Sequence, residues 1–574
     1  MKPRFDRFHT PIPIKQALPW FAAIALLLPS VFLLQPAPVD ETRYLAVAWN
    51  MHSSGQWLVP WLDGAPYSDK APMLFWLIDL MWEVTGVHAW AARLLEMGIA
   101  LATLPLLASV GRRLGLDGPA RQASMWLWVG CAAMAIYADV VMFDMALTAC
   151  TLAAWRATPA LAGRRWATGL FALAMALGAG ILVKGPVALL VGGMPALLAP
   201  WWLPSVRTRP VAFYLRLLVA LAAAVLVALA WALPAARAGG THYADAIFLR
   251  QTLGRVVKSF AHARPWWWYL PVLPLMLLPW TLSMGRGDTA AKSSSAIHDR
   301  LPGMPDRFAL AAFVPCFVAF GLISGKQPHY LLPLLPALAM AAGMRLGANH
   351  WRVSAARVGL TLAIAGAAVI VGLCWLADPV HRLGAGICGV LIITMSVLYL
   401  WRSGRSLPVR VAALGMLGTL ALCKLAFVLS IGNRYDVRPE ASLVAAAQRQ
   451  GIPLLYAGTP YGVFTFAGRL TSPIHHATSP TAILAWAAAH PHGWIISASS
   501  SYRFSPPPFY RHPYMGRSLG IWRAGLIAEK PGTMPPQKHE AISASTSDRS
   551  DCPPESTTVA TCEDPPPSWI RFAG

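Results

Sequence analysis

The sequence predicts a polytopic α-helical membrane protein, because apolar residues are abundant, charged residues are scarce and long apolar runs recur. Of the 574 residues, 56% are apolar and 13% are charged, and the charged share is about half of that in soluble domains. Apolar runs recur from Leu18 to Leu429, and about 20 consecutive apolar residues suffice to cross a bilayer. A soluble globule, a fibrous chain and a disulfide scaffold are therefore excluded for the main body.

Basic clusters between the apolar runs predict the topology, because Lys and Arg accumulate in cytoplasmic loops. The stretch 73–86 is short and contains Asp79 and Glu83, so we expect it to lie at the interface rather than to span. If every basic cluster lies in the cytoplasm, the N-terminus is also cytoplasmic and the C-terminus lies on the opposite, outer side of the membrane. About thirteen spans result, near 17–34, 91–110, 122–138, 144–161, 166–183, 186–203, 212–234, 266–284, 308–324, 329–346, 358–376, 384–401 and 410–431.

The formal net charge of +22 would favour nucleic-acid binding in a soluble protein. Here the positive-inside rule explains it, and no compact basic domain is left over, so we expect no nucleic-acid partner. The eight cysteines contain no CxxC pair, so no zinc site is signalled. Cys552 and Cys562 in the polar tail either pair or stay free.

The composition changes after the membrane body, which we assign to residues 1–432. Strand-like runs near 453–456, 494–497 and 518–522, with helical patterns near 441–450 and 481–489, predict a small α/β domain outside the membrane over 433–528. Residues 529–574 are rich in Pro, Ser and Thr, which is typical of a disordered tail.

Charged side chains from distant segments are predicted to meet at the outer face. Charges at a bilayer boundary are costly unless they are paired or hydrated, although interfacial anchoring explains any single one of them. A site with both carboxylates and cations suits transfer from a phosphate-linked donor, because a carboxylate takes a proton or orients the nucleophile while cations stabilise the departing phosphate. The outer set is Asp40, Glu41, Arg43, Lys70, Asp139, Asp144, Lys184, Arg250, Arg255, Lys258, His262, Arg264, Lys326, His329 and Tyr330.

Several of these residues lie in motifs that resemble a known family. Residues 40–44, 55–60 and 67–72 resemble the first periplasmic loop of the ArnT-like and protein-O-mannosyltransferase-like bacterial enzymes, which are membrane glycosyltransferases of the GT-C class. The resemblance implies a GT-C bundle with periplasmic juxtamembrane helices. It covers about residues 17–346, and its later motifs follow in order at Asp144–Thr148, Val183–Pro186, Arg255–Trp280 and Lys326–Pro333.

The resemblance also implies roles for the matched residues. Asp40 is the candidate catalytic carboxylate and Asp144 a second acid, with Glu41 as a further catalytic candidate that alternatively faces water. We expect His262 and His329 to be polar loop residues and Trp266–Trp268 to form an interfacial aromatic belt. The candidates for binding the donor phosphate are Lys70, Arg255 and Tyr330, followed by Arg43, Lys184 and Lys326.

The sequence also departs from the family pattern. Asp69-Lys70-Ala71-Pro72 stands where the family usually has Glu-Lys-Pro-Pro, and Thr252 stands where aminoarabinose-type relatives often have a histidine. Both changes put the assignment of aminoarabinose transfer to lipid A in doubt, and they weaken any proposal of a bound metal. An Asp-x-Asp motif of the soluble glycosyltransferase kind does not occur, so we expect no cofactor and no catalytic divalent ion.

The implied partners are an undecaprenyl-phosphate-linked sugar donor, a lipid or protein acceptor, and membrane lipids. The implied location is the bacterial inner membrane, with the active site facing the periplasm. The alternative is a polytopic transporter of lipids or sugar-lipids. Transporters place ionisable residues near mid-membrane, often on broken spans, whereas the charged residues singled out here gather at the predicted outer ends.

Overall fold

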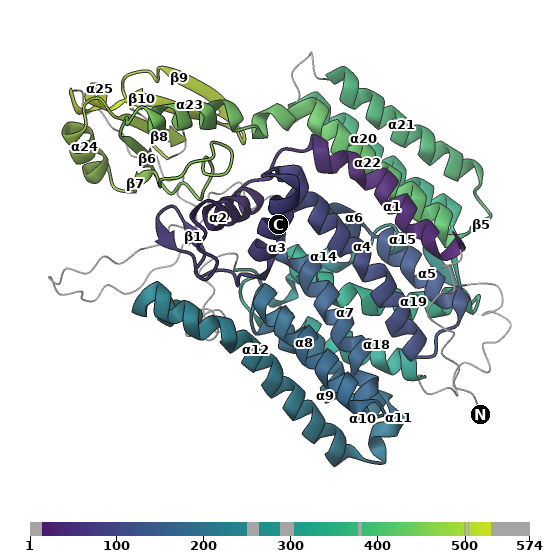
Figure 1. Cartoon of the computed structure of the whole chain (residues 1–574). Helices are drawn as coiled ribbons and strands as arrows, with labels where there is room; N and C mark the ends of the chain where they lie inside the picture. The colour runs from purple at the N-terminus through teal and green to yellow at the C-terminus, as the bar shows by residue number, and fades with distance from the viewer. Residues whose placement is uncertain are drawn as a thin grey trace, which may run out of the picture.

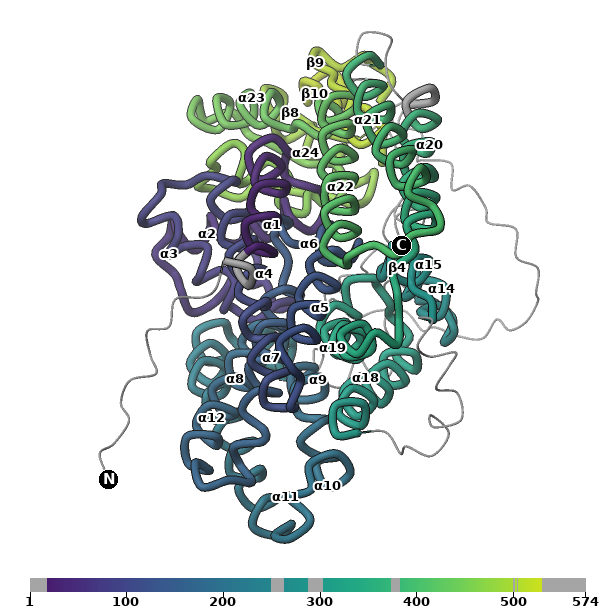
Figure 2. Tube along the Cα trace, turned by 90° about the vertical axis from the view of Figure 1, so that its right-hand side faces the viewer, coloured from purple at the N-terminus to yellow at the C-terminus, as the bar shows by residue number. Residues whose placement is uncertain are grey.

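The computed structural model describes residues 14–248, 263–286, 303–376, 382–498, 501–502 and 504–529. It shows a large bundle of helices with a small sheet-containing unit at one end, beside α2 (Asp40–Ser54) and away from α10 and α11 (Figures 1 and 2). Each of the thirteen predicted ranges contains helix. Within the described residues, eight helices are long and apolar enough to cross a membrane. The helical membrane class is therefore confirmed, and the number of spans stays a prediction.

The bundle is centred on α7 (Phe143–Leu161), which packs against α4, α8 and α9. The first and last helices of the bundle, α1 and α22, lie side by side (Figure 1). One large apolar core runs through these helices. The remaining bundle elements are α1 (Ile14–Leu33), α4 (Ala89–Arg113), α5 (Gly118–Val129), α6 (Ala132–Tyr137), α8 (Trp166–Lys184), α9 (Val187–Leu197), α10 (Ala199–Trp202), α11 (Pro204–Arg207), α12 (Pro210–Asp245), η2 (Trp266–Trp268), α14 (Tyr269–Met276), α15 (Trp280–Ser283), α18 (Met304–Leu322), η3 (Pro328–Leu334), α19 (Leu335–Gly347), α20 (Ala355–Leu376), α21 (Arg382–Trp401) and α22 (Val409–Ile431).

Several predicted spans differ from single regular helices, and 186–203, 266–284 and 329–346 are each divided among two or more helices. The range 122–138 contains two helices, α5 and α6, and Cys131 between them caps α6 by accepting a hydrogen bond from the Met134 amide. The range 212–234 is too short, because α12 continues to Asp245. The extra turns carry Tyr243, which is buried beside Val59 from the segment that follows α2.

Two helices outside the predicted spans support the charged residues. The helix α2 begins at Asp40, so its first-turn carboxylates lie where the helix dipole favours negative charge. A short hairpin of β1 (Trp61–Leu62) and β2 (Ala65–Pro66) leads to α3 (Met73–Thr85), which packs on α2 and α4. The helix α3 occupies the stretch that the sequence analysis excluded from the spans.

The small unit at the C-terminal side is built on a five-stranded sheet of order β7-β6-β8-β10-β9. The strands β6, β7 and β8 run parallel, and β10 is antiparallel to both β8 and β9. Strands β6, β8 and β10 and helices α23 and α24 lie where the sequence pattern predicts them. The elements are α23 (Arg438–Arg449), β6 (Leu454–Ala457), β7 (His475–Ala477), α24 (Pro480–Ala489), β8 (Trp494–Ala498), β9 (Tyr510–Tyr514), β10 (Arg517–Arg523) and α25 (Ala524–Glu529).

A second sheet was not expected from the sequence. Its strands β3 (Met284–Arg286), β4 (Trp351–Ser354) and β5 (Ser406–Leu407) come from three loops between bundle helices. Each loop carries one of the basic clusters that the topology prediction placed in the cytoplasm. Because hydrogen bonds join the strands, the described parts of the three loops lie at the same end of the bundle. The side of the membrane that they face stays a prediction.

The sheet-containing unit is attached to α2, the hairpin and α3 by the segment 461–473. The Gly462 amide donates to the Asp63 carboxylate at 2.9 Å, and Trp49 Nε1 donates to the Leu470 carbonyl at 2.7 Å. Phe466 stacks on Trp82 with ring centroids 5.5 Å apart. A Cβ on Gly462 would lie 2.6 Å from Ala46 Cβ on α2, so only glycine permits this close approach.

This contact predicts a pH-dependent contribution to stability. Burial raises the pKa of Asp63 to about 6, so the ionised form is disfavoured in the folded protein. The stabilisation is therefore full below pH ~4 and is lost as the pH rises through about 6, by about 3 kcal/mol. Asp63→Asn should abolish this dependence and raise the unfolding temperature at pH 7, measured in detergent between pH 4 and 8.

Asparagine also tolerates the positive φ of 51° at position 63 and keeps an acceptor for Gly462. The control is Asp245→Asn, which removes an exposed carboxylate from the end of α12 and should leave the pH profile as it is. An Asp63→Asn profile that still falls between pH 4 and 6 would contradict the assignment.

Candidate functional site

The first half of the candidate site lies at the beginning of α2. Arg43 Nη2 contacts Asp40 Oδ1 at 2.5 Å, with 45% of the Asp40 side chain exposed. The Tyr44 hydroxyl donates to the same oxygen at 3.2 Å. The Lys70 ammonium lies 5.9 Å from the Tyr44 ring centroid and 5.8 Å from that of Phe143. Asp40 thus presents an accessible carboxylate among two cations and a phenol.

The charges around Asp40 decide its protonation state. Burial by itself would raise the pKa of Asp40, but the nearby positive charges of Arg43 and Lys70 outweigh it and hold that pKa below the usual range. Asp40 is therefore ionised at neutral pH. A carboxylate of low pKa is a weak general base, so while Arg43 is paired to it this carboxylate is better suited to orienting a group or balancing positive charge.

The second half of the candidate site joins three other segments. Asp144 lies in the first turn of α7 and is 2% exposed. Lys184, in the last turn of α8, contacts Asp144 Oδ1 at 2.5 Å, and its ammonium lies 4.4 Å from the Tyr330 ring centroid. His329 Nε2, on η3, lies 3.9 Å from Asp144 Oδ2. A buried acid is thus balanced by a lysine beside a tyrosine.

Phe143 connects the two halves. It directly precedes Asp144, lies under the Lys70 ammonium, and packs edge-on against Tyr44 with ring centroids 5.0 Å apart. The structure therefore brings together six of the residues that the sequence analysis selected, from α2, the loop before α3, α7, α8 and η3. They are Asp40, Arg43, Lys70, Asp144, Lys184 and Tyr330.

Glu41 faces the protein interior. It is 1% exposed, and its two oxygens accept hydrogen bonds from Arg93 Nε and Nη2 at 2.6 and 2.7 Å. The Ala37 amide donates to it at 2.6 Å. The alternative that Glu41 faces water is therefore wrong. Its catalytic role is also disfavoured, because both oxygens are already held by a buried cation that fixes the start of α2.

Lys326 binds backbone carbonyls and does not join the other site residues. It is 2% exposed, and its ammonium donates to the Arg264 carbonyl at 3.0 Å and to the Ile323 carbonyl. These bonds hold two loops together and leave it poorly suited to a phosphate. Arg255, the remaining phosphate candidate, lies outside the described residues, as do Thr252 and His262. Trp266 and Trp267 are largely exposed, and their membrane-belt role stays a prediction.

Sequence reasoning missed three residues of this region. His329 was expected to be a loop residue, yet it lies between Tyr137 and Tyr330 and reaches Asp144. Tyr44 lies in the motif 40–44, but the sequence analysis assigned it no role. Arg93 is a cation inside an apolar helix. Such residues are rare in membrane spans and are almost always paired, so the sequence did indicate that Arg93 has a buried partner.

Comparison with known proteins places this geometry in context. No family model matches the chain. An undecaprenyl phosphate-alpha-4-amino-4-deoxy-L-arabinose arabinosyl transferase of Pseudomonas aeruginosa (strain LESB58) is 31% identical over 332 residues, which are 57% of this chain and 57% of that protein. The enzyme of the same name from Edwardsiella ictaluri is 28% identical over 344 residues, with 57% and 59% covered. The chain thus covers less than two thirds of these curated relatives.

Solved structures extend the likeness over most of the chain. The structure of ArnT from Cupriavidus metallidurans bound to undecaprenyl phosphate matches with a TM-score of 0.65 and 17% identity, covering 88% of this chain and 97% of ArnT. The chain has the ArnT fold. The apo structure of the same ArnT gives a TM-score of 0.66 at 18% identity with the same coverage. The predicted resemblance to ArnT-like proteins is therefore confirmed.

Proposed function

We propose that this protein is a glycosyltransferase of the inner membrane that moves a sugar from a polyprenyl-phosphate donor to a lipid acceptor at the periplasmic face. The likeness to transferases named for undecaprenyl-phosphate-linked aminoarabinose supports a polyprenyl-phosphate donor. The ArnT fold, in a relative crystallised with undecaprenyl phosphate, supports the same class of ligand. The departures at Asp69 and Thr252 leave the sugar to experiment.

The observation that carries this proposal is the gathering of Asp40, Lys70, Asp144, Lys184 and Tyr330 from separate segments. Cations stabilise a departing lipid phosphate, and an ionised carboxylate beside them opposes the positive charge that develops on the sugar. The cations Lys70 and Arg43, whose charges act on Asp40, are the proposed ligands of the donor phosphate. Asp144 is neutralised by Lys184, so the pair is suited to keeping that lysine and Tyr330 in place.

The proposed reaction is a single displacement. An acceptor oxygen attacks the anomeric carbon while the bond from that carbon to the phosphate oxygen breaks, so polyprenyl phosphate leaves with the bonding electrons and the anomeric centre inverts. If the acceptor is a hydroxyl, Asp40 takes its proton. A donor phosphate that draws Arg43 away would raise the pKa of Asp40 and make it a better base. If the acceptor is a phosphate, no base is needed and Asp40 balances charge.

Lys70→Ala should weaken binding of the donor and of free polyprenyl phosphate by about tenfold or more, since a charge-assisted bond to phosphate is lost. The measurement is the affinity for undecaprenyl phosphate in detergent, together with KM for the donor. The control is Arg438→Ala, which removes an exposed cation of the sheet-containing unit that pairs with Asp436 instead and should leave the affinity unchanged. An unchanged affinity for Lys70→Ala would remove Lys70 from the phosphate site.

The transporter alternative is separated from transfer by one assay. Purified protein in detergent, given a polyprenyl-phosphate sugar and lipid acceptors, should release free polyprenyl phosphate and form a glycosylated lipid. A transporter would form neither product, because detergent leaves it with no second compartment. The mass of the product also identifies the sugar and the acceptor.

A further inference from the structure

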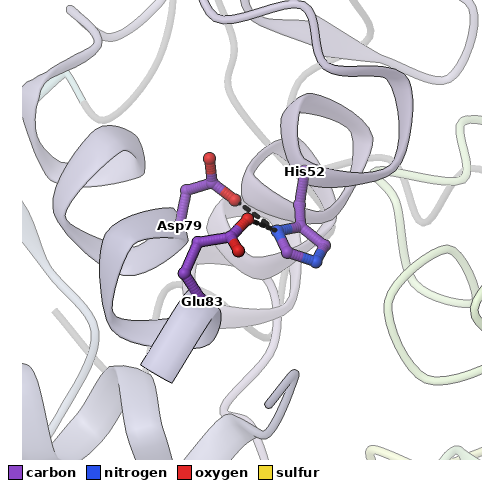
Figure 3. Close-up of side chains that lie close together, drawn as sticks. All are labelled: His52, Asp79 and Glu83. Carbon is purple, nitrogen blue, oxygen red and sulfur yellow. Dashed lines mark hydrogen bonds and ion pairs between the residues drawn. The ribbon is translucent and has the colours of Figure 1, made fainter. Parts of the chain in front are cut away.

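A second cluster of ionisable side chains lies on α2 and α3, away from the candidate catalytic site. His52 comes from the last turn of α2, and Asp79 and Glu83 are four residues apart on α3, so both carboxylates lie on one face of that helix. Figure 3 shows both carboxylates directed at the same histidine nitrogen. His52 Nδ1 lies 2.5 Å from Asp79 Oδ1 and 3.7 Å from Glu83 Oε1.

The three ligand atoms are close enough to share one ion. One nitrogen or oxygen from each residue lies within 4.8 Å of the others. Zinc binds His nitrogen and carboxylate oxygen at about 2.0–2.2 Å in tetrahedral geometry, which sets neighbouring ligand atoms about 3.3 Å apart. His52 and Asp79 therefore need to separate by less than about 1 Å to admit the ion, a shift within reach of side-chain rotation.

The electrostatics of the cluster also favour a cation. The Asp79 side chain is 3% exposed and that of Glu83 is 59% exposed, so one carboxylate is buried while the other opens to solvent. Among the described residues, no lysine or arginine forms an ion pair with either carboxylate, and His52 alone faces both. A single imidazolium balances only one of the two carboxylates and leaves Glu83 to be solvated by water. A divalent ion bound to neutral His52 balances both carboxylates.

Aromatic rings enclose the buried side of the cluster. The Trp82 ring lies edge-on to His52 with centroids 5.9 Å apart, and Trp49 lies 6.1 Å away. These are the same two tryptophans that contact Phe466 and Leu470 of the C-terminal segment. The cluster thus lies where α2, α3 and the segment 461–473 meet, with low-dielectric walls on one side and the Glu83 opening on the other.

We propose that His52, Asp79 and Glu83 bind one divalent transition-metal ion of the zinc type, which joins the end of α2 to α3. The mixed nitrogen and oxygen ligands select such an ion over Mg²⁺ or Ca²⁺, which prefer oxygen alone. His52 lies twelve residues beyond Asp40, or about 18 Å along the helix, so the ion is structural and takes no part in transfer. It fixes α2, and with it the direction of the Asp40 carboxylate.

The test uses full-length protein in detergent without a histidine tag, stripped with EDTA and then dialysed against Zn²⁺ alone. We expect roughly one zinc per chain by elemental analysis, and a higher unfolding temperature with Zn²⁺ than with Mg²⁺. Glu83→Gln, which changes an exposed side chain and preserves folding, should weaken zinc affinity by about tenfold or more. His52→Gln should abolish binding.

Two control variants make the result specific. His88→Gln removes an exposed histidine and Asp245→Asn an exposed carboxylate, both outside the cluster. Both variants should bind zinc with the same affinity as the original chain. Absence of bound zinc, or equal affinity in Glu83→Gln and the original chain, would overturn the proposal and leave an ion pair between His52 and Asp79. Because neither measurement involves a sugar donor, the outcome is independent of the proposed transferase activity.

Discussion

Replacing Asp40 with asparagine should lower the rate of sugar transfer by at least about 100-fold while the protein still folds and inserts. The substitution removes a carboxylate that Arg43 and Lys70 keep ionised. The enzyme thereby loses either its proton acceptor or the negative charge that opposes the positive charge developing on the sugar. The measurement is turnover of a polyprenyl-phosphate sugar by purified protein, with KM for the donor determined separately. We expect the loss in kcat rather than in donor binding.

The comparison variant for this experiment is Asp436→Asn. Asp436 is also a surface carboxylate with a neighbouring arginine, here Arg438 at 2.7 Å, but it lies in the sheet-containing unit. Its loss should change turnover by less than about twofold. Near-normal turnover of Asp40→Asn in folded protein would reject Asp40 as the essential carboxylate, whatever the other residues contribute.

Arg93→Met should produce the largest loss of stability, about 3–5 kcal/mol in the free energy of unfolding. The substitution leaves the Glu41 carboxylate buried without its cation, and an unpaired buried charge costs that much. It also removes the donor to the Leu34 and Gln35 carbonyls before α2. The measurement is denaturant unfolding of the purified protein, followed by tryptophan fluorescence.

A double variant separates charge from packing. Adding Glu41→Gln to Arg93→Met removes the orphaned charge, so part of the loss should be recovered. Arg345→Met is the control, because the Arg345 side chain is 35% exposed in its pair with Asp306, and exposed pairs contribute about 1 kcal/mol or less. If Arg93→Met proved no worse than Arg345→Met, the buried pair would not hold the start of α2.

The membrane class and most helix positions could be predicted because apolar length is a direct physical requirement of spanning. The break between α5 and α6 could not, since it depends on Ala413 and Trp280 approaching Gly130 from elsewhere in the fold. The three-stranded sheet of loops was missed for a similar reason. Its strands are two to four residues long, too short for an alternating pattern to appear.

The candidate site was predicted in part because its residues lie in motifs. What the sequence could not separate was the role of adjacent acids. Asp40 and Glu41 are neighbours, yet the helix rotates about 100° per residue, so one carboxylate meets the accessible cluster and the other enters the core beside Arg93. Lys184 and Lys326 look alike in sequence, but one ammonium meets Asp144 and the other meets two carbonyls.

The contact between Trp49 and Leu470 spans 421 positions of the chain, and this has a consequence for biosynthesis. The helix that carries Asp40 therefore leaves the ribosome long before the segment 461–473 that covers it. A nascent chain reaches its finished α2 environment only after residues 461–473 have been made. Protein synthesis stopped before that point should yield inserted helices that have no transfer activity.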